Sequence, residues 1–296
     1  MHLTLKQLRY FEALAEQGHF GRAAEVSSIS QPALSIQIKE LEATLGAVLF
    51  ERGARQVRLT RFGEEFADRV RPILRAVDEL GDLARASGDA LGGELRLGVI
   101  PTIAPYLLPR LLGDLGAGYP ELEIMVRESV TPRLIEELGA GRLDAAIVAL
   151  PVSEPSLVEV PLFEEPMLLI RPKAEAGRAV PSGAELADRR LLLLEEGHCF
   201  RDQALSFCSL GQGRTRDGLD GSSLSTLVQM VGAGIGVTLI PEMAVPVETR
   251  SASVAVDRFP DPQPSRTVGM VWRKSSPLAP RLSEIADSLK MAFHPD

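Results

Sequence analysis

Residues 30–46 read SQPALSIQIKELEATLG, and the pattern of this stretch decides the fold expected for the N-terminal region. Ser30 is a typical N-cap residue, and Pro32 suits the first turn of a helix. Gly46 is a common residue just past a helix end. Between these signals the apolar residues recur every three or four positions, as on the buried stripe of an amphipathic helix: Leu34, Ile38, Leu41 and Leu45.

Two shorter helices are predicted before this stretch. Apolar residues at helical spacing cover 5–15 and are followed by Gly18, and 20–26 is a short segment in which Ala23 and Ala24 allow close packing. A tight turn then leads into the third helix, which is the arrangement of a helix-turn-helix. In that motif the last helix enters the major groove of double-stranded DNA.

A hairpin is predicted after the third helix. Residues 50–60 alternate like two short strands, which together would form a wing with Arg52 and Arg55 near its tip. Arginines there suit phosphate or minor-groove contacts, although a solvated charged face is the alternative. The residues expected at the DNA are Arg22, Gln31, Pro32, Ser35, Gln37, Lys39, Arg52 and Arg55.

Charge is distributed unevenly along the chain. The 296 residues carry a formal net charge of -8, yet residues 1–62 hold eight basic and six acidic side chains, a net +2 that leaves -10 for the other 234. A small basic domain attached to a larger acidic body is therefore expected. The 45% apolar and 24% charged composition excludes fibrous and disordered classes, and two cysteines are too few for a disulfide scaffold.

The sequence favours a cytoplasmic protein without membrane contact. Lys6, Arg9 and Glu12 interrupt the first apolar stretch, which is unlike a signal peptide. The stretch 221–241 carries no charge and is long enough for a bilayer span, but its serines and four glycines fit a buried helix-turn-strand better.

The segment 63–91 is predicted to be a linker helix followed by a glycine-rich hinge. Its apolar residues alternate at spacings of four and three, the 3.5-residue period of a two-helix seam. The alternative is a helix that packs on its own domain, which Leu74 and Leu83 favour. The residues expected at a dimer seam are Phe66, Val70, Ile73, Val77 and Leu80.

The remaining residues, 92–296, are predicted to form an α/β domain. Strand and helix patterns alternate, which implies a parallel sheet with right-handed crossovers. Such an array can form two lobes with a cleft between them. The expected strands are 94–100, 122–127, 145–150, 166–171, 190–194, 235–240 and 267–272, and the expected helices include 106–115, 132–138 and 280–293.

Several segments of the N-terminal region strongly resemble LysR-type transcriptional regulators: LRYF at 8–11, HFGRAA at 19–24, SQPALS at 30–35, IKELE at 38–42 and LFER at 49–52. The resemblance implies a winged helix-turn-helix at 1–62, a long linker helix and a periplasmic-binding-protein-like effector domain. Its chain would cross between lobes twice, near 161–164 and 261–265. Lobe I would then comprise 92–162 and 266–296, and lobe II 163–265. The implied partners are promoter DNA, further copies of the chain in a homodimer or homotetramer, and RNA polymerase.

Four further segments resemble the peroxide-responsive members of this family: IPTIAPYLLP at 100–109, GHCFRDQA at 197–204 and the stretches 232–245 and 266–278. The implied activity is sensing of hydrogen peroxide through Cys199 and Cys208, with reset by a cellular dithiol. By the same resemblance Thr102 and Thr131 supply hydroxyls to a peroxide pocket, and His198 and Arg266 support the charge. The implied pocket and thiolate support together comprise Thr102, Thr131, His198, Arg201, Asp202 and Arg266.

The residues themselves also indicate a thiol switch, with a small buried hydrophobe as the alternative for each cysteine. Cys199 opens a helix-like segment with Arg201 two residues on, and a helix N-terminus and nearby cations favour the thiolate. Cys208 has no charged neighbour in sequence, as expected for a resolving thiol. On one continuous helix the two would be about 13.5 Å apart along the axis. A disulfide needs Cα atoms within about 7 Å, so oxidation would have to refold the segment.

Three alternatives remain at this stage. Thr102 and Thr131 each precede a predicted helix and could be N-caps. The chain could be a LysR-type regulator of a small metabolite, with incidental cysteines. A thiol peroxidase is disfavoured because an enzyme has no use for a winged helix-turn-helix, so we predict a regulator and no enzyme. No cofactor and no metal are expected, because His198, Cys199 and Cys208 lack an evident fourth zinc ligand.

Overall fold

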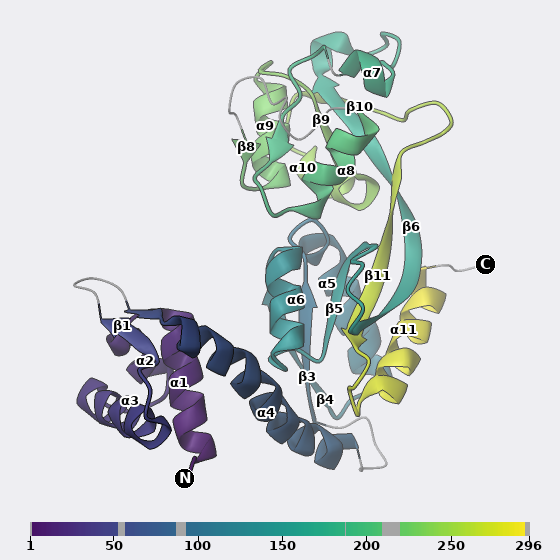
Figure 1. The fold of residues 1–296 in the computed structure, drawn as a ribbon. Helices are drawn as coiled ribbons and strands as arrows, with labels where there is room; N and C mark the ends of the chain where they lie inside the picture. The colour runs from purple at the N-terminus through teal and green to yellow at the C-terminus, as the bar shows by residue number, and fades with distance from the viewer. Residues whose placement is uncertain (1, 53–56, 87–92, 187, 209–219, 294–296) are drawn as a thin grey trace. The chain divides into compact units, whose positions relative to one another are not determined.

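The structure is a computed structural model that describes residues 2–52, 57–86, 93–186, 188–208 and 220–293. The chain divides into two compact units, Met1–Ala84 and Arg85–Asp296 (Figure 1). Each unit has its own buried apolar core. The mixed α/β class and the N-terminal helix-turn-helix are as predicted.

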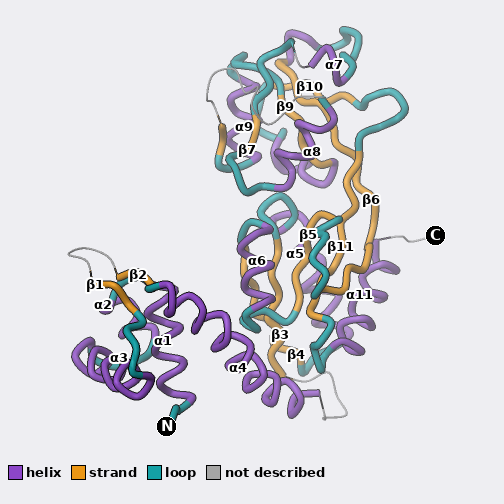
Figure 2. Tube along the Cα trace, viewed as in Figure 1, coloured by secondary structure: helices purple, strands orange, loops and turns teal. Residues whose placement is uncertain are grey.

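The first unit begins with three helices, α1 (Leu5–Gln17), α2 (Phe20–Val26) and α3 (Gln31–Leu45). The wing follows as the antiparallel strands β1 (Phe50–Arg52) and β2 (Val57–Leu59). The predicted signals act as expected, because the Ser30 side chain caps α3 and Gly46 ends it in the left-handed conformation, with φ of 67°. Figure 2 shows these helices in purple and the two short strands in orange.

The apolar stripe of α3 belongs to the buried core of the first unit. Leu34 and Leu41 are fully buried, and they pack in one cluster with Phe11 of α1 and Leu49. The Phe11 ring also lies against Phe50, with ring centroids 5.3 Å apart. The wing is therefore fixed to the helices by aromatic packing.

Helix α4 (Arg61–Ala86) begins two residues before the predicted linker and belongs partly to this core. Val70 is 2% exposed and packs in the cluster of the first unit, as Leu74 does, which at this position favours the alternative of a helix that packs on its own domain. Phe66 packs against the same cluster. Farther along the helix Ile73 and Leu80 are exposed, and a seam there stays a prediction.

The second unit contains a sheet whose order is β10-β6-β11-β5-β3-β4, with β9 also paired to β6. The strands β3 (Gly93–Val99), β4 (Leu122–Glu128) and β5 (Ala145–Leu150) are parallel, as predicted. However, β11 (Ser265–Arg273) runs antiparallel to β5 and β6, so the sheet is mixed. The helices around it are α5 (Ala104–Gly118), α6 (Thr131–Gly139) and α11 (Ala279–Phe293).

One long strand, β6 (Leu157–Pro172), serves both lobes of this unit. Its first part pairs with β11 up to Pro166, and from Met167 onward it pairs with β9 (Thr238–Pro241) and β10 (Val254–Asp257). The prediction placed a strand only at 166–171 and missed the rest, because the prolines in 157–166 mask the strand pattern. Figure 1 shows β6 and β11 passing together from one lobe into the other.

The second lobe consists of short helices and strands next to the second part of β6. Its helices are α7 (Gly183–Leu186), α8 (Cys199–Phe207), α9 (Leu224–Gly232) and α10 (Val245–Glu248), with 3-10 turns at Lys173–Glu175 and Glu242–Ala244. The parallel pair β7 (Leu193–Leu194) and β8 (Asp220–Gly221) lies beside them. The predicted strands 190–194 and 235–240 are shorter here, at Leu193–Leu194 and Thr238–Pro241.

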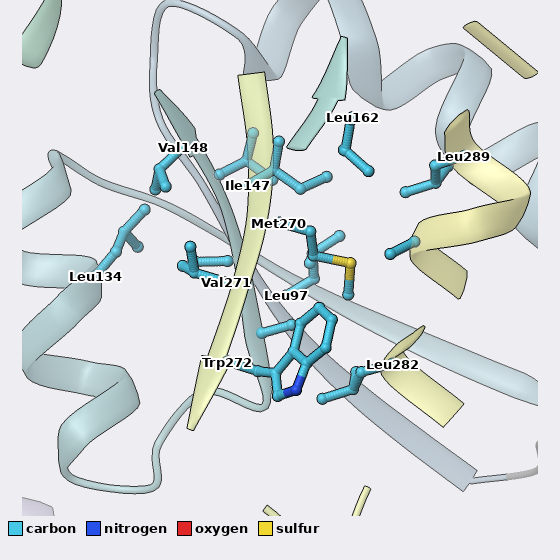
Figure 3. Close-up of a cluster of buried hydrophobic side chains, with 14 of the residues drawn as sticks. Leu97, Leu134, Ile147, Val148, Leu162, Met270, Val271, Trp272, Leu282 and Leu289 are labelled. Carbon is cyan, nitrogen blue, oxygen red and sulfur yellow. The ribbon is translucent and has the colours of Figure 1, made fainter. Parts of the chain in front are cut away.

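The core of the first lobe lies on both faces of β11. Figure 3 shows Val271 pointing toward Leu134 of α6, and Met270 and Trp272 pointing to the opposite side, where Leu282 and Leu289 of α11 lie. Successive residues of a strand face opposite sides, so β11 separates two apolar layers. Within the described ranges, none of the helices combines the length and the apolarity that crossing a bilayer requires.

One buried ion pair joins β3 to the start of β5. Asp144 is fully buried and accepts hydrogen bonds from Arg96, at 2.8 Å from the backbone nitrogen and at 2.7 Å from Nη2. Removing one partner of such a pair leaves the other polar groups unsatisfied, which is costly in a dry interior.

We expect Asp144→Ala to lower the free energy of unfolding of the second unit by about 2–3 kcal/mol, less than a fully buried pair would give because Arg96 is 28% exposed. The measurement is urea denaturation of the full chain. Asp114→Ala is the matched control, because its pair with Arg110 lies at the surface, and a loss under about 0.5 kcal/mol is expected. Equal losses in both variants would contradict a structural role for the buried pair.

Candidate functional site

Cys199 is the first residue of α8 and is half-buried. Its N-cap residue is His198, whose side chain makes no capping hydrogen bond, and the Arg201 N–H of the first turn donates to the His198 carbonyl at 2.9 Å. An anion at this position is stabilised by the helix dipole. Both Cys199 and Cys208 are free thiols in this structure.

Although α8 lies in the second lobe, Cys199 packs against the apolar cluster of the first lobe. The residues around it explain this position. Gly197 has φ of 94°, and a side chain there would meet Val130 at 3.7 Å. On the other side, the Phe200 ring lies 5.4 Å from the Arg266 guanidinium carbon. The chain neighbours of Cys199 thus lie near the N-cap residue of α6 and against Arg266 at the start of β11.

Arg266 is a buried cation near this site, and Glu165 and Thr102 hold it. Its Nε donates to Glu165 Oε2 at 2.8 Å, its Nη1 donates to the Thr102 hydroxyl at 2.8 Å, and its Nη2 donates to the Thr102 carbonyl at 3.0 Å. All three residues are buried, with exposed fractions of 3% or less. The structure therefore brings Thr102 and Arg266 together, as the pocket prediction requires.

The two threonines are not helix caps. The N-cap of α5 is Ile103 and that of α6 is Val130, and neither helix has a side-chain capping bond. The Thr131 Oγ1 atom is buried and has no hydrogen-bond partner among the described residues. A buried hydroxyl without a partner is costly, so Thr131 has unused capacity to bind a polar molecule.

His198 does not supply a positive charge at neutral pH. Burial lowers the pKa of His198 below its ordinary value, and Glu195 opposes this only in part. The lowered pKa favours the neutral imidazole, and support of the charge in this pocket by His198 stays a prediction. It can still donate or accept a hydrogen bond.

Arg201 and Asp202 both belong to α8, and they differ in burial. Arg201 is buried, donates to the Leu194 carbonyl at 2.6 Å and forms an ion pair with Asp220 at 3.0 Å. Its charge is therefore paired across β7 and β8, and it fastens α8 to that small sheet. Asp202 is exposed in the first turn of α8.

Cys208 is the C-cap residue of α8 and is fully buried in the second-lobe cluster. Burial raises the pKa of its thiol to about 11, so it is protonated at neutral pH. Nine residues of helical rise separate it from Cys199, about 13.5 Å along the axis. A disulfide between them is therefore incompatible with an intact α8.

The described part of the predicted DNA-binding surface is accessible. Gln31, Pro32 and Lys39 are exposed on α3, and Ser35 and Gln37 are half-exposed. Arg22 is exposed and donates to the Gln17 carbonyl at 2.7 Å. The Arg52 side chain and all of Arg55 lie outside the described residues.

Sequence reasoning missed three polar residues at the junction of the lobes: Glu165, Tyr106 and Glu248. The Tyr106 hydroxyl donates to Glu248 at 2.7 Å, and its ring packs against the second-lobe cluster. Burial and Glu248 raise the pKa of Tyr106 well above its ordinary value. No local motif marks these residues, because Tyr106 and Glu248 are 142 positions apart and Glu165 bonds residues 78 and 101 positions away.

Among the residues that the structure describes, no group of three or more histidine, cysteine, aspartate or glutamate side chains is arranged to hold a metal ion.

Comparison with known proteins gives matches in both halves of the chain. Residues 5–64 match the helix-turn-helix of bacterial regulatory proteins of the lysR family, and residues 88–293 match the LysR substrate binding domain. The DNA-binding transcriptional dual regulator OxyR of Escherichia coli K12 is 41% identical over 97% of this chain and 95% of its own length.

Solved structures agree with this result. A full-length cysteine-to-aspartate variant of OxyR from Pseudomonas aeruginosa is 39% identical, with a TM-score of 0.74 over 98% of this chain and 96% of that one. A peroxide-bound cysteine variant of OxyR from Corynebacterium glutamicum is 37% identical, with a TM-score of 0.67 over 99% and 93%. The chain therefore belongs to the LysR family of bacterial helix-turn-helix regulators.

Proposed function

We propose that this protein is a DNA-binding transcriptional regulator that senses hydrogen peroxide through Cys199. The observation that carries the proposal is the position of Cys199 at the N-terminus of α8, where its neighbour Phe200 lies against Arg266 and Gly197 lies near Val130, the N-cap residue of α6. Arg266 is a buried cation, and Thr131, the first residue of α6, has a buried hydroxyl that no described residue bonds. The similar regulators named hydrogen peroxide-inducible genes activator support the same function.

The proposed reaction begins with the Cys199 thiolate. Its sulfur attacks one peroxide oxygen, the O–O bond breaks, and the product is a sulfenic acid with release of hydroxide. Thr102 and Thr131 would bind the peroxide, and Arg266 would stabilise the negative charge of the leaving oxygen. The Cys208 thiol then condenses with the sulfenic acid, so that a disulfide forms and water leaves.

The second step couples chemistry to conformation. Cys208 is buried at the far end of α8, so it reaches Cys199 only after this helix has unwound. A disulfide therefore stabilises a refolded state of the segment, which is how a covalent event can bias a two-state element. We propose that this refolding changes how the copies of a homodimer or homotetramer sit on promoter DNA.

Further parts of the proposal follow from the family and the chemistry. A cellular dithiol would reduce the disulfide by thiol exchange, and RNA polymerase would be contacted at the promoter. Cys199 would react once per activation cycle, so the protein is a regulator and not an enzyme. A cytoplasmic location fits a thiol that must be kept reduced between signals.

Cys199→Ser should abolish the peroxide response, because a serine hydroxyl does not reduce peroxide. The measurement is transcription from a target promoter before and after peroxide, together with DNA affinity of the reduced protein. Affinity in the unoxidised state should stay within about twofold of the parent, because the site lies outside the DNA-binding unit. A full peroxide response in this variant would refute the sensor function.

Cys208→Ser should stop the reaction at the sulfenic acid. In the parent chain, peroxide should yield one internal disulfide, seen as a loss of two hydrogens by mass spectrometry. In the variant, a sulfenic-acid reagent such as dimedone should label Cys199 instead. If Cys208→Ser still formed an internal bridge under non-reducing conditions, Cys208 would not be the resolving thiol.

Lys39→Ala should weaken binding to all DNA sequences and lower the salt dependence by about one unit of slope, as expected for one lost phosphate contact. Lys39 is exposed on α3, the recognition helix. Lys290→Ala is the matched control, because that lysine lies on α11 and pairs with Asp287. A salt slope unchanged by Lys39→Ala would remove this residue from the DNA interface.

A further inference from the structure

A buried glutamate, Glu165, lies behind the proposed peroxide pocket and has no role in the reaction described so far. It is 3% exposed and is the carboxylate partner of Arg266 at 2.7 to 2.8 Å. The two residues are directly opposite each other in the register of β6 and β11. The pairing of the two strands therefore sets where this ion pair lies, and its role depends on the function proposed above.

Hydrogen-bond polarity gives the pair a specific consequence. A guanidinium can only donate, so the Thr102 hydroxyl must accept from Arg266 at 2.8 Å. Its own hydrogen is then directed to another acceptor. Because Arg266 Nη2 also donates to the Thr102 carbonyl, the hydroxyl and the backbone of this residue are held by one rigid fork.

Glu165 fixes that fork through both of its oxygens. Oε2 accepts from Arg266, and Oε1 accepts from the backbone nitrogen of Met243 at 3.0 Å. A glutamine at position 165 could accept from only one of these two donors, because its side-chain nitrogen would face the N–H of the other. Met243 belongs to the second lobe, so the carboxylate also ties the pocket to the segment that follows β9.

We propose that Glu165 is the positioning residue of the peroxide pocket: it holds Arg266 so that the Thr102 hydroxyl is an obligate hydrogen-bond donor to bound peroxide. The thiolate sulfur forms the S–O bond and loses two electrons, and the leaving oxygen departs with the O–O electron pair as hydroxide. Thr102 lowers the barrier by donating to that oxygen, and a solvent proton converts the hydroxide to water. Glu165 touches neither peroxide nor sulfur.

The groups that set the local charge come from several elements. Arg266 and Glu165 are the ion pair, and Tyr106 of α5 interacts electrostatically with both. Glu248 of α10 accepts from Tyr106, and Glu195 acts on the neutral His198. Neutralising Glu165 leaves the Arg266 charge uncompensated, which favours a thiolate nearby.

The test measures the rate of Cys199 sulfenic acid formation with hydrogen peroxide, from pH 5 to 9, in full-length protein carrying Cys208→Ser. Glu165→Gln should lower the plateau rate constant about tenfold because Thr102 loses its orientation, as misplaced catalytic groups commonly do. The pH of half-maximal rate should also fall, because the uncompensated cation favours the thiolate. A purely structural role for Glu165 would not combine a lower plateau rate constant with a lower pH of half-maximal rate.

Glu164→Gln is the matched control. This neighbouring glutamate is exposed on the other face of β6 and bonds with Ser265 and Thr267. Its rate constant and pH profile should equal those of the parent.

Two more variants test the route through Thr102. Thr102→Val should lower the plateau rate as much as Glu165→Gln, and the double variant should be no slower than either alone. Arg266→Lys keeps the charge but loses the fork, so its plateau rate should fall without the shift in pH. This variant decides the matter if Glu165→Gln does not fold.

The outcomes separate this inference from the sensor function. If peroxide does not oxidise Cys199 in the parent chain, the sensor function fails. If it does, but Glu165→Gln retains the parental rate and pH profile, the positioning role is overturned. Additive losses in the double variant would also overturn it, because Glu165 would then not act through Thr102.

Discussion

The second unit depends on the pairing of β6 with β11. Nine residues of β11 pair with β6 in the first lobe, and the same β6 continues into the sheet of the second lobe. Because β6 belongs to the sheets of both lobes, its backbone connects the two lobes at the point where they meet. The buried pair of Glu165 and Arg266 sits at that point, so its geometry is set by backbone hydrogen bonds rather than by flexible loops.

The connection through β6 explains how Cys199, in α8 of the second lobe, packs against the core of the first lobe. Phe200 rests on Arg266, and Arg266 is bonded to Thr102. The cysteine beside Phe200 lies at the N-terminus of α8 and packs against the first-lobe cluster, while Thr102 and Arg266 form a bonded polar group next to Phe200. A preorganised polar site of this kind costs little reorganisation when charge develops during a reaction.

The two thiols are prepared for different roles by the same helix. Cys199 opens α8 and is half-exposed, whereas Cys208 closes it in an apolar cluster that keeps its thiol protonated. Helical geometry prevents them from meeting while α8 is intact. The reduced fold and the disulfide-bonded state therefore exclude each other, which is the physical condition for a switch.

The sequence by itself determined the helix-turn-helix, the helices and strands with strong periodicity, the family and the two thiols, because caps, apolar stripes and short motifs are local signals. It did not determine that Val70 packs in the core of its own unit, since a helix in a dimer seam and a helix packed on its own domain show the same spacing of apolar residues. Nor did it show that Arg201 is paired with Asp220, that His198 is neutral or that Glu165 supports the site. Only the tertiary structure decided these, because burial and contacts between separate elements set the charge and orientation of a side chain.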